Sequence, residues 1–423
     1  MNRTIAPEYK PVKKLNLVSP QNITLDNGIP VYYFNAGSQE VLRIEVLLKA
    51  GSRYQSAPLI AHVVNNLLNE GTKTHSAAQI AETFEYYGAY LHTECELDNA
   101  SVILYLQNKH LNTLLPLMLE LLNEAIFPEH ELHIFLENAK QKFLVNQQKV
   151  NYLARKHFAH ALYGESTYGF MVTEEHYKNM QHQLLIDFYK EMYVAENMTL
   201  IVSGKVGEKE LKAINTFFNQ CIRGNKKTKT NLNLPEYKAC KKHISKKDAV
   251  QNAIRIGKVL FNKTHTDYFD FQVLNTLLGG YFGSRLMSNI REDKGYTYGI
   301  GSAIVSLEDS GYFFISTEVG ANVSNAATEE IYKEIKLLIN NKVSEEELGL
   351  VKNYFAGTLL RSMDGPFALA EKFKAAHTFG YDMTYYNTML EHIYSITPNR
   401  IQQLAELYLQ PESFTEVVVG KID

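Results

Sequence analysis

Residues 61–72 read Ala-His-Val-Val-Asn-Asn-Leu-Leu-Asn-Glu-Gly-Thr, and the spacing of the polar residues in this apolar stretch is its most informative property. His62, Asn65 and Asn66 occupy positions i, i+3 and i+4, which share one face of a helix. The stretch has the outline of the inverted zinc motif H-x-x-E-H, in which two histidines bind the metal and the glutamate activates water. Only the first histidine of that motif is present.

The two asparagines are poor substitutes for the residues of an active zinc site. Zinc prefers thiolate, imidazole or carboxylate donors, and a catalytic site normally has three protein ligands and one open position for water. A neutral amide cannot take a proton from water at neutral pH, and loss of a general base alone typically costs about 10²–10⁴ in rate. We therefore expect neither a metal ligand set nor a catalytic residue here. Taken alone, His62 is interpreted as a core or capping residue of a helix.

The composition is that of an ordinary globular protein. The chain has 423 residues, of which 45% are hydrophobic and 21% charged, so its length predicts two to three domains. The net charge is −3, and the lysine-rich stretch at residues 226–247 is interleaved with Asn and Thr, which is typical of a solvated linker. We expect no nucleic-acid partner and no membrane partner.

The three cysteines and the N-terminus bear on the compartment. The cysteines are odd in number and widely spaced, which predicts neither a disulfide framework nor a zinc knuckle. The N-terminal segment lacks the apolar core of a secretion signal, and the chain has no run of 18 apolar residues. We therefore expect a cytoplasmic protein.

The chain also shows signs of internal duplication. Residues 64–68 (Val-Asn-Asn-Leu-Leu) are echoed by residues 274–278 (Leu-Asn-Thr-Leu-Leu), and residues 97–101 are echoed by residues 307–311. Both pairs have the same offset of 210 residues. A shared offset of this length predicts two similar domains rather than a solenoid.

The order of predicted elements repeats in the two halves. Alternating and apolar runs predict strands at residues 41–48, 89–95, 101–107 and 198–203, and then at 252–260, 299–305 and 311–318. Helical periodicity predicts helices at residues 57–70, 76–87, 111–125, 129–150, 152–162 and 183–193, and then at 266–278, 325–341 and 344–361. This grouping favours an α+β fold in which each domain has a mostly antiparallel sheet with helices packed on one face. The polar stretch between the halves predicts domains at 1–222 and 246–423, joined by a linker at 223–245.

A series of short segments resembles the M16 (insulinase-like or pitrilysin-like) metallopeptidases, and more closely the short M16B chains that pair as dimers. Their order and spacing along the whole chain carry the resemblance. The segments are residues 24–31, 49–54, 62–72, 87–90, 162–164, 202–204, 278–286 and 290–298. The resemblance implies two homologous M16-type domains of the LuxS/MPP-like kind. The glycine-rich loop of the mitochondrial processing peptidase α subunit has no match here, so presequence recognition is not implied.

The resemblance also implies where a third zinc ligand would lie. In M16 enzymes this ligand is a glutamate about 75–80 residues beyond H-x-x-E-H. The matching window, Phe143-Leu144-Val145-Asn146, contains no carboxylate. The i,i+3 histidine pairs at residues 130–133 and 157–160 do not match a zinc motif and are interpreted as solvent-facing helix residues.

A second M16 signature is intact. Arg291 and Tyr298 match the Arg–Tyr pair with which members of the family bind the substrate backbone next to the scissile bond. Gly295 between them would allow a tight turn that directs both side chains into the cavity. The alternative is an Arg291 in a surface ion pair with Glu292 or Asp293 and a Tyr298 packed in the sheet.

Loss of the zinc residues with retention of the Arg–Tyr pair is the pattern of the non-catalytic half in this family. The leading hypothesis is a substrate-binding subunit of a heterodimeric M16B zinc peptidase, inactive alone and with no cofactor of its own. Its partner would be a catalytic subunit that has an intact H-x-x-E-H and carries the zinc, and the substrate would be a peptide or an unfolded protein. The alternatives are a homodimeric scaffold or peptide-holding protein and, less favoured, an enzyme with different chemistry.

Overall fold

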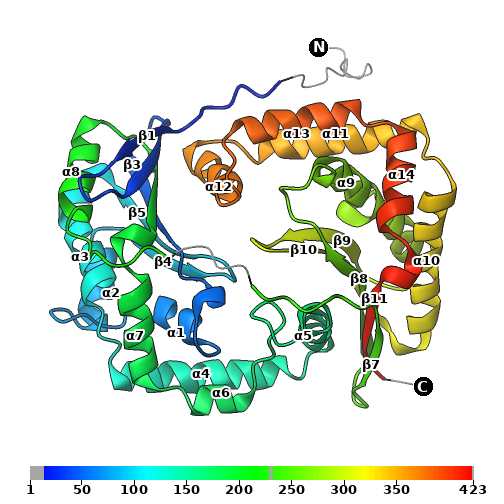
Figure 1. Cartoon of the computed structure of the whole chain (residues 1–423), viewed down its shortest axis with the longest axis horizontal. Helices are drawn as coiled ribbons and strands as arrows, with labels where there is room; N and C mark the ends of the chain where they lie inside the picture. The colour runs from blue at the N-terminus through cyan, green and yellow to red at the C-terminus, as the bar shows by residue number, and fades with distance from the viewer. Residues whose placement is uncertain (1–13, 228–231, 422–423) are drawn as a thin grey trace.

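Two α+β domains lie side by side in the computed structural model, which describes residues 14–227 and 232–421. The first domain forms the left half of Figure 1 and the second domain the right half. Residues 1–13, which make up most of the N-terminal segment expected to lack a secretion signal, lie outside the described residues. So do residues 228–231 of the predicted linker.

The first domain contains a six-stranded sheet in the order β1-β2-β6-β3-β5-β4. Its strands are β1 (Gln21–Thr24), β2 (Pro30–Asn35), β3 (Val41–Leu48), β4 (Tyr90–Cys95), β5 (Ala100–Gln107) and β6 (Met198–Gly204). The helices of this half of the chain are α1 (Ile60–Asn66), α2 (Ala77–Tyr86), α3 (Leu111–Glu124), α4 (Glu129–Asn146), α5 (Val150–Tyr163), α6 (Glu174–Lys178), α7 (His182–Met192) and α8 (Glu208–Phe218).

The second domain contains a five-stranded sheet in the order β7-β11-β8-β10-β9. Its strands are β7 (Lys241–Ser245), β8 (Gln251–Leu260), β9 (Ile300–Ser306), β10 (Gly311–Gly320) and β11 (Thr415–Gly420). Its helices are α9 (Tyr268–Asn275), the π-helical turns η4 (Thr276–Gly280) and η5 (Met287–Asp293), α10 (Ser324–Asn340), α11 (Glu345–Arg361), α12 (Pro366–His377), α13 (Thr384–Ser395) and α14 (Pro398–Tyr408).

The two sheets have the same strand pairing, which confirms the predicted duplication. In the first sheet β6 is parallel to β2 and antiparallel to β3, and β3 continues antiparallel into β5 and β4. In the second sheet β11 is parallel to β7 and antiparallel to β8, and β8 continues antiparallel into β10 and β9. The first domain adds β1 at one edge.

The equivalent turns of the two domains touch each other. Asp98 lies between β4 and β5, and Glu308 lies 210 residues later between β9 and β10; the Glu308 backbone N–H donates to the Asp98 carboxylate over 2.9 Å. Arg53 follows β3 and bridges both turns, because its guanidinium contacts Asp98 at 3.2 Å, Glu308 at 2.6 Å and Asp309 at 2.6 Å. The buried arginine thereby joins the equivalent turns of the two domains.

Each domain also sends one helix onto the open face of the other domain's sheet. Helix α5 packs on β8 and β11, and α12 packs on β2 and β6; both helices can be followed across the molecule in Figure 1. Apolar contacts hold them: Phe158 of α5 is buried against the second sheet, and Phe373 of α12 lies 4.8 Å from the Tyr32 ring. The exchange makes the two domains one interlocked unit, since neither sheet is fully covered by its own helices.

A buried ion network reinforces α12 on the first sheet. Glu45 on β3 is fully buried and accepts from Arg43 at 2.8 Å and from Lys374 of α12 at 2.9 Å. Glu371 of α12 bonds the same arginine and lies 3.0 Å from Lys374. Burial works to raise the pKa of Glu45, but the charges of Lys374 and Arg43 lower it overall. The network keeps this carboxylate ionised in the interior of the interface.

The predicted strands and most predicted helices agree with the structure to within a few residues. Helix α1 is shorter than the expected 57–70 and ends at Asn66, and strand β7 begins inside the segment predicted as linker. Sequence reasoning assigned no elements beyond residue 361, where α12, α13, α14 and β11 lie. Within the described ranges, no helix combines the length and apolar character needed to cross a bilayer.

Candidate functional site

Helix α1 places the three residues of the degenerate zinc motif in different environments. His62 is exposed, Asn66 is half-buried, and Asn65 is fully buried. The Asn65 side-chain NH₂ donates to the Ser101 carbonyl at 3.3 Å and to the Tyr193 hydroxyl at 3.3 Å. The NH₂ group of Asn65 therefore connects α1 to β5 and to the end of α7, while its Oδ1 is buried without a hydrogen-bond partner among the described residues.

Asn66 is bonded back to the first residue of the motif. Its NH₂ donates to the His62 carbonyl at 2.8 Å and lies 3.3 Å from His62 Nδ1. The His62 ring also lies 6.2 Å from the Phe135 ring of α4. Desolvation of the ring is the larger cause that lowers the pKa of His62, and the positive charge of Lys142 lowers it further. This histidine is neutral at physiological pH and interacts with its own helix.

Residues 143–146, which correspond to the position of a third zinc ligand, make other contacts. Phe143 is buried and its ring packs 5.4 Å from that of Tyr177, while Asn146 accepts from Lys149 at 3.0 Å. The α4 residues that act on His62 are instead Phe135 and Lys142, which lie earlier in the helix. One is apolar and the other is a cation.

This arrangement does not fit a zinc ion. Two of the motif positions offer only neutral amide oxygens, which bind zinc weakly, and a lysine charge acts on the histidine that would have to bind the metal. A dication needs anionic or imidazole donors that converge on one point. Among the residues in the described ranges, no cluster of three or more His, Cys, Asp or Glu could hold a metal ion.

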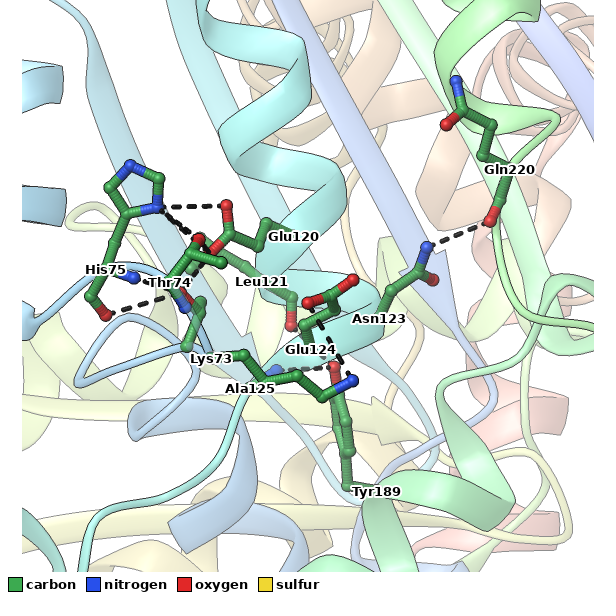
Figure 2. A network of polar contacts seen from close by, with 11 residues as sticks. Lys73, Thr74, His75, Glu120, Leu121, Asn123, Glu124, Ala125, Tyr189 and Gln220 are labelled. Atoms are coloured by element: carbon green, nitrogen blue, oxygen red, sulfur yellow. Dashed lines mark hydrogen bonds and ion pairs between the residues drawn. The ribbon is translucent and has the colours of Figure 1, made fainter.

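The loop that follows α1 is anchored by a polar network on α3 (Figure 2). The hydroxyls of Thr72 and Thr74 donate to Glu120, and His75 Nδ1 lies 3.0 Å from the same carboxylate. Burial works to raise the pKa of Glu120, but these hydrogen bonds lower it overall. Nearby, Lys73 approaches Glu124 at 3.9 Å. Glu120 is therefore a structural acceptor rather than a general base.

The Arg–Tyr pair lies in the second domain, on either side of a tight turn. Arg291 is in η5, a π-helical turn of the kind that often marks functional sites. Gly295 has a φ of +66°, as the predicted turn requires. The Arg291 Nε donates to the Tyr298 carbonyl at 3.0 Å, and its guanidinium lies 4.6 Å from the centroid of the Phe282 ring. These contacts fix the spacing of the two residues.

The alternative interpretation holds for Arg291, which pairs with Glu292 at the surface, but not for Tyr298. Tyr298 is 94% exposed rather than packed in the sheet. The ion pair of Arg291 with Glu292 is long, at 3.8 Å, and both side chains are accessible to solvent. Exposed ion pairs of this kind contribute little to stability. Tyr298 is accordingly free to contact a ligand, whereas Arg291 is solvent-accessible but also contacts Phe282, Glu292 and the Tyr298 carbonyl.

Tyr298 lines an open groove of about 310 Å³. The groove is formed by the start of α5, by β8 and β10, and by the turn at residues 297–299; it is lined by Asn151, Ala154, Gln251, Ala253, Ile254, Arg255, Thr297, Tyr298, Gly299, Ser316, Thr317 and Glu318. Arg291 is not among these residues, so only one member of the pair faces the groove.

Comparison with known proteins identifies the family. The model described as "Insulinase (Peptidase family M16)" matches residues 31–174, and the model described as "Peptidase M16 inactive domain" matches residues 179–355. The chain belongs to the M16 peptidase family. Among curated M16 relatives, the uncharacterised zinc protease YmxG of Bacillus subtilis is 26% identical over 81% of this chain and 84% of its own length. An uncharacterised zinc protease of Rickettsia felis is 25% identical over 80% and 83%.

Solved structures share the fold of this M16 chain at low sequence identity. A structure described as a peptidase M16 inactive domain from Pseudomonas fluorescens superposes with a TM-score of 0.88, at 21% identity, over 96% of this chain and 99% of that one. A chain of Complex III2 from Candida albicans superposes with a TM-score of 0.77, at 14% identity, over 95% of each chain. These similarities confirm the two-domain α+β fold.

The sequence did not predict two residues that lie at this candidate site. Phe282 supports the Arg291 guanidinium, and Arg255 lies in the groove beside Tyr298. The sequence carried a signal for Arg255 alone, because an arginine between Ile254 and Ile256 is unusual in a strand buried on both sides. Phe282 had no such signal, since its contact with Arg291 depends on the turn between η4 and η5.

Proposed function

We propose that this chain is the non-catalytic, substrate-binding subunit of a heterodimeric M16B zinc peptidase and forms one half of its peptide chamber. The observation that carries the proposal is the contrast between the two domains. Two zinc-motif positions are occupied by neutral amides whose NH₂ groups are bonded within the fold, whereas Arg291 and Tyr298 flank a tight turn with their side chains accessible.

In this proposal the two subunits divide the work. The partner carries an intact H-x-x-E-H and the zinc, and performs the hydrolysis. This chain presents donors to the peptide backbone: a permanent guanidinium from Arg291 and a phenolic hydroxyl from Tyr298. Both donors suit a carbonyl oxygen that gains negative charge during attack.

The second candidate function is a scaffold or peptide-holding homodimer without a role in proteolysis. The superposition on a chain of Complex III2 is compatible with it, because that chain is part of a large assembly. The exposed Tyr298 argues against a purely structural role, since an aromatic ring that is 94% exposed contributes little to packing.

The first experiment is a gentle affinity purification of the tagged chain from the cytoplasmic fraction of its native cells, where we propose that the complex resides. A co-purifying M16 homologue with a complete H-x-x-E-H, in a near one-to-one ratio, is the expected result. Recovery of the chain alone, or within an unrelated large complex, would favour the scaffold.

The second experiment tests the substrate contact in the reconstituted complex. Tyr298→Phe removes one hydroxyl, and we expect kcat/KM for peptide cleavage to fall about tenfold, the effect of one lost hydrogen bond to a reacting group. Tyr86→Phe is the matched control, because Tyr86 of α2 is 81% exposed and lies outside the groove. Equal activities of the two variants would remove Tyr298 from the proposed role.

A further inference from the structure

The groove beside Tyr298 contains a charge that the fold does not neutralise. Arg255 lies in the middle of β8, is half-buried, and lines the groove. Its guanidinium lies 4.6 Å from the centroid of the Phe314 ring on β10. Within the described ranges, no hydrogen-bond acceptor or carboxylate is bound to it.

The other arginines at comparable depth are paired. Each of five has at least one carboxylate within ion-pair distance: Arg43 with Glu45, Arg53 with Glu308, Arg285 with Glu347, Arg291 with Glu292, and Arg400 with Asp267. Such pairing is the normal condition of an arginine withdrawn from water. Arg255 departs from a rule that this chain otherwise follows.

The charges around Arg255 do not compensate for it. Desolvation lowers the pKa of Arg255; the nearby Tyr312 hydroxyl works to raise it, and the positive charge of Arg155 on α5 lowers it further. One carboxylate lines the groove, that of Glu318, and it accepts a hydrogen bond from the Asn151 side chain at 2.9 Å. On the shared sheet Arg255 is opposite Ser316, whereas Glu318 is opposite Ala253, one step further along the groove. The end of the groove near Arg255 is therefore positive.

We propose that this groove binds a peptide carboxylate, with Arg255 as the residue that selects it. The carboxylate is an acidic side chain or the C-terminus of the bound peptide, two sources with the same chemistry. The inference rests on the proposed peptide-binding function and specifies which peptides are preferred.

The geometry at Arg255 suits this ligand. The guanidinium lies over the Phe314 ring, and its N–H groups, which have no acceptor among the described residues, can make two parallel hydrogen bonds to a carboxylate. The hydroxyl of Ser316, opposite Arg255 in the sheet, can donate to the same group. Tyr298 in the same groove lies close enough to bind the backbone of the same peptide.

The test compares matched fluorescent peptides on the isolated chain by anisotropy. One series carries a single Glu at successive positions of an uncharged sequence with an amidated C-terminus, and the second carries Gln at the same positions. A third set has a free C-terminal carboxylate in place of the amide. Comparison of the Glu and Gln series tests for recognition of a side-chain carboxylate, and comparison of free and amidated C-termini tests for recognition of a terminal one.

Three variants accompany the wild-type chain. Arg255→Gln removes the charge, and Arg255→Lys keeps it on a different donor. Arg361→Gln removes an exposed arginine at the end of α11, outside the groove, and controls for net charge. We expect the wild-type chain to prefer one class of carboxylate peptide about tenfold, the lower range for a charge-assisted hydrogen bond. The preference should disappear in Arg255→Gln, persist in part in Arg255→Lys, and remain in Arg361→Gln.

Two results would overturn the inference alone: equal binding of charged and uncharged peptides by the wild-type chain, or an unchanged preference in Arg255→Gln. Failure of every peptide to bind would instead contradict the proposed peptide-binding function. Circular dichroism of each variant checks that the fold is retained.

Discussion

Helix α1 and the groove beside Tyr298 belong to the two equivalent domains, yet they use their polar side chains in opposite ways. On α1 the NH₂ groups of Asn65 and Asn66 are bonded to the core and to the helix itself, and one buried atom, Asn65 Oδ1, has no partner among the described residues. In the groove, Arg255 has no acceptor among the described residues, and Tyr298 is almost fully exposed. The α1 region uses most of its polar atoms within the fold, while the groove keeps groups available to a ligand.

The contrast has an energetic basis. A polar group that is bonded within the fold contributes to stability or is neutral, whereas a desolvated group without a partner has a cost. Positions that retain such a cost are expected to be functional sites, because selection for stability alone would remove them. Measurements on both regions can test this distinction.

The largest expected effect is a difference in the free energy of unfolding between variants of two arginines. Arg53→Gln should lower the free energy of unfolding by about 3 kcal/mol, because it leaves the clustered carboxylates of both domains without their central cation. Arg255→Gln should change it by less than about 1 kcal/mol, because the lost stacking on Phe314 is offset by relief of desolvation. Urea denaturation of both variants measures the difference. A similar loss in both would show that Arg255 is a structural residue.

The next effect concerns restoration of the zinc motif. Asn65→Glu places a carboxylate where the side chain is fully buried, and should cost about 2–3 kcal/mol in stability. Combined with Asn66→His, it should still give no zinc-dependent peptide cleavage, since a third ligand is missing and the charge of Lys142 remains. Zinc-dependent cleavage by the double variant would show that the metal ligands had been placed wrongly. Asn66→His alone serves as the control for stability.

Local sequence patterns predicted much of the secondary structure. The strands at 41–48 and 311–318, the Ser76 cap of α2 and the turn at Gly295 follow from alternation, capping and glycine conformation, which neighbouring residues determine. The exchange of α5 and α12 between domains could not be predicted, because both are amphipathic helices whose periodicity does not say which sheet they cover.

The candidate site shows the same limit. The sequence itself shows that two residues of H-x-x-E-H are replaced by asparagine, and the family resemblance singled out Arg291 and Tyr298. That Lys142 acts on His62, and that Arg255 rather than Arg291 faces the groove, depends on contacts between elements far apart in sequence. Such contacts leave no periodic signal in a single chain.

A smaller effect should appear on acidification. The charges of Lys374 and Arg43 keep the pKa of Glu45 below its usual range, so the folded protein binds fewer protons here than the unfolded chain. The resulting stability is fully present above the unfolded pKa, about 4.3, and is lost as the pH falls through the folded value. In Glu45→Gln the acid limb of melting temperature against pH should be flatter, at lower stability overall. An acid limb that keeps the wild-type steepness would assign acid sensitivity to other carboxylates.

The smallest effect tests whether α4 lies against α1 as described. The charge of Lys142 contributes to the lowered pKa of His62, after desolvation. Lys142→Gln should therefore raise that pKa, measured by NMR titration of the ring, and added salt should reduce the difference because the two groups are accessible to solvent. Lys140→Gln is the matched control, since Lys140 lies on the same helix but pairs with Glu137 at 2.6 Å. If the His62 pKa responded to neither change, Lys142 would lie too far away to oppose a metal ion. The argument against zinc binding would then rest on the two asparagines alone. The contrast between α1 and the groove would lie in the types of side chain present, and the charge of Lys142 would play no part in it.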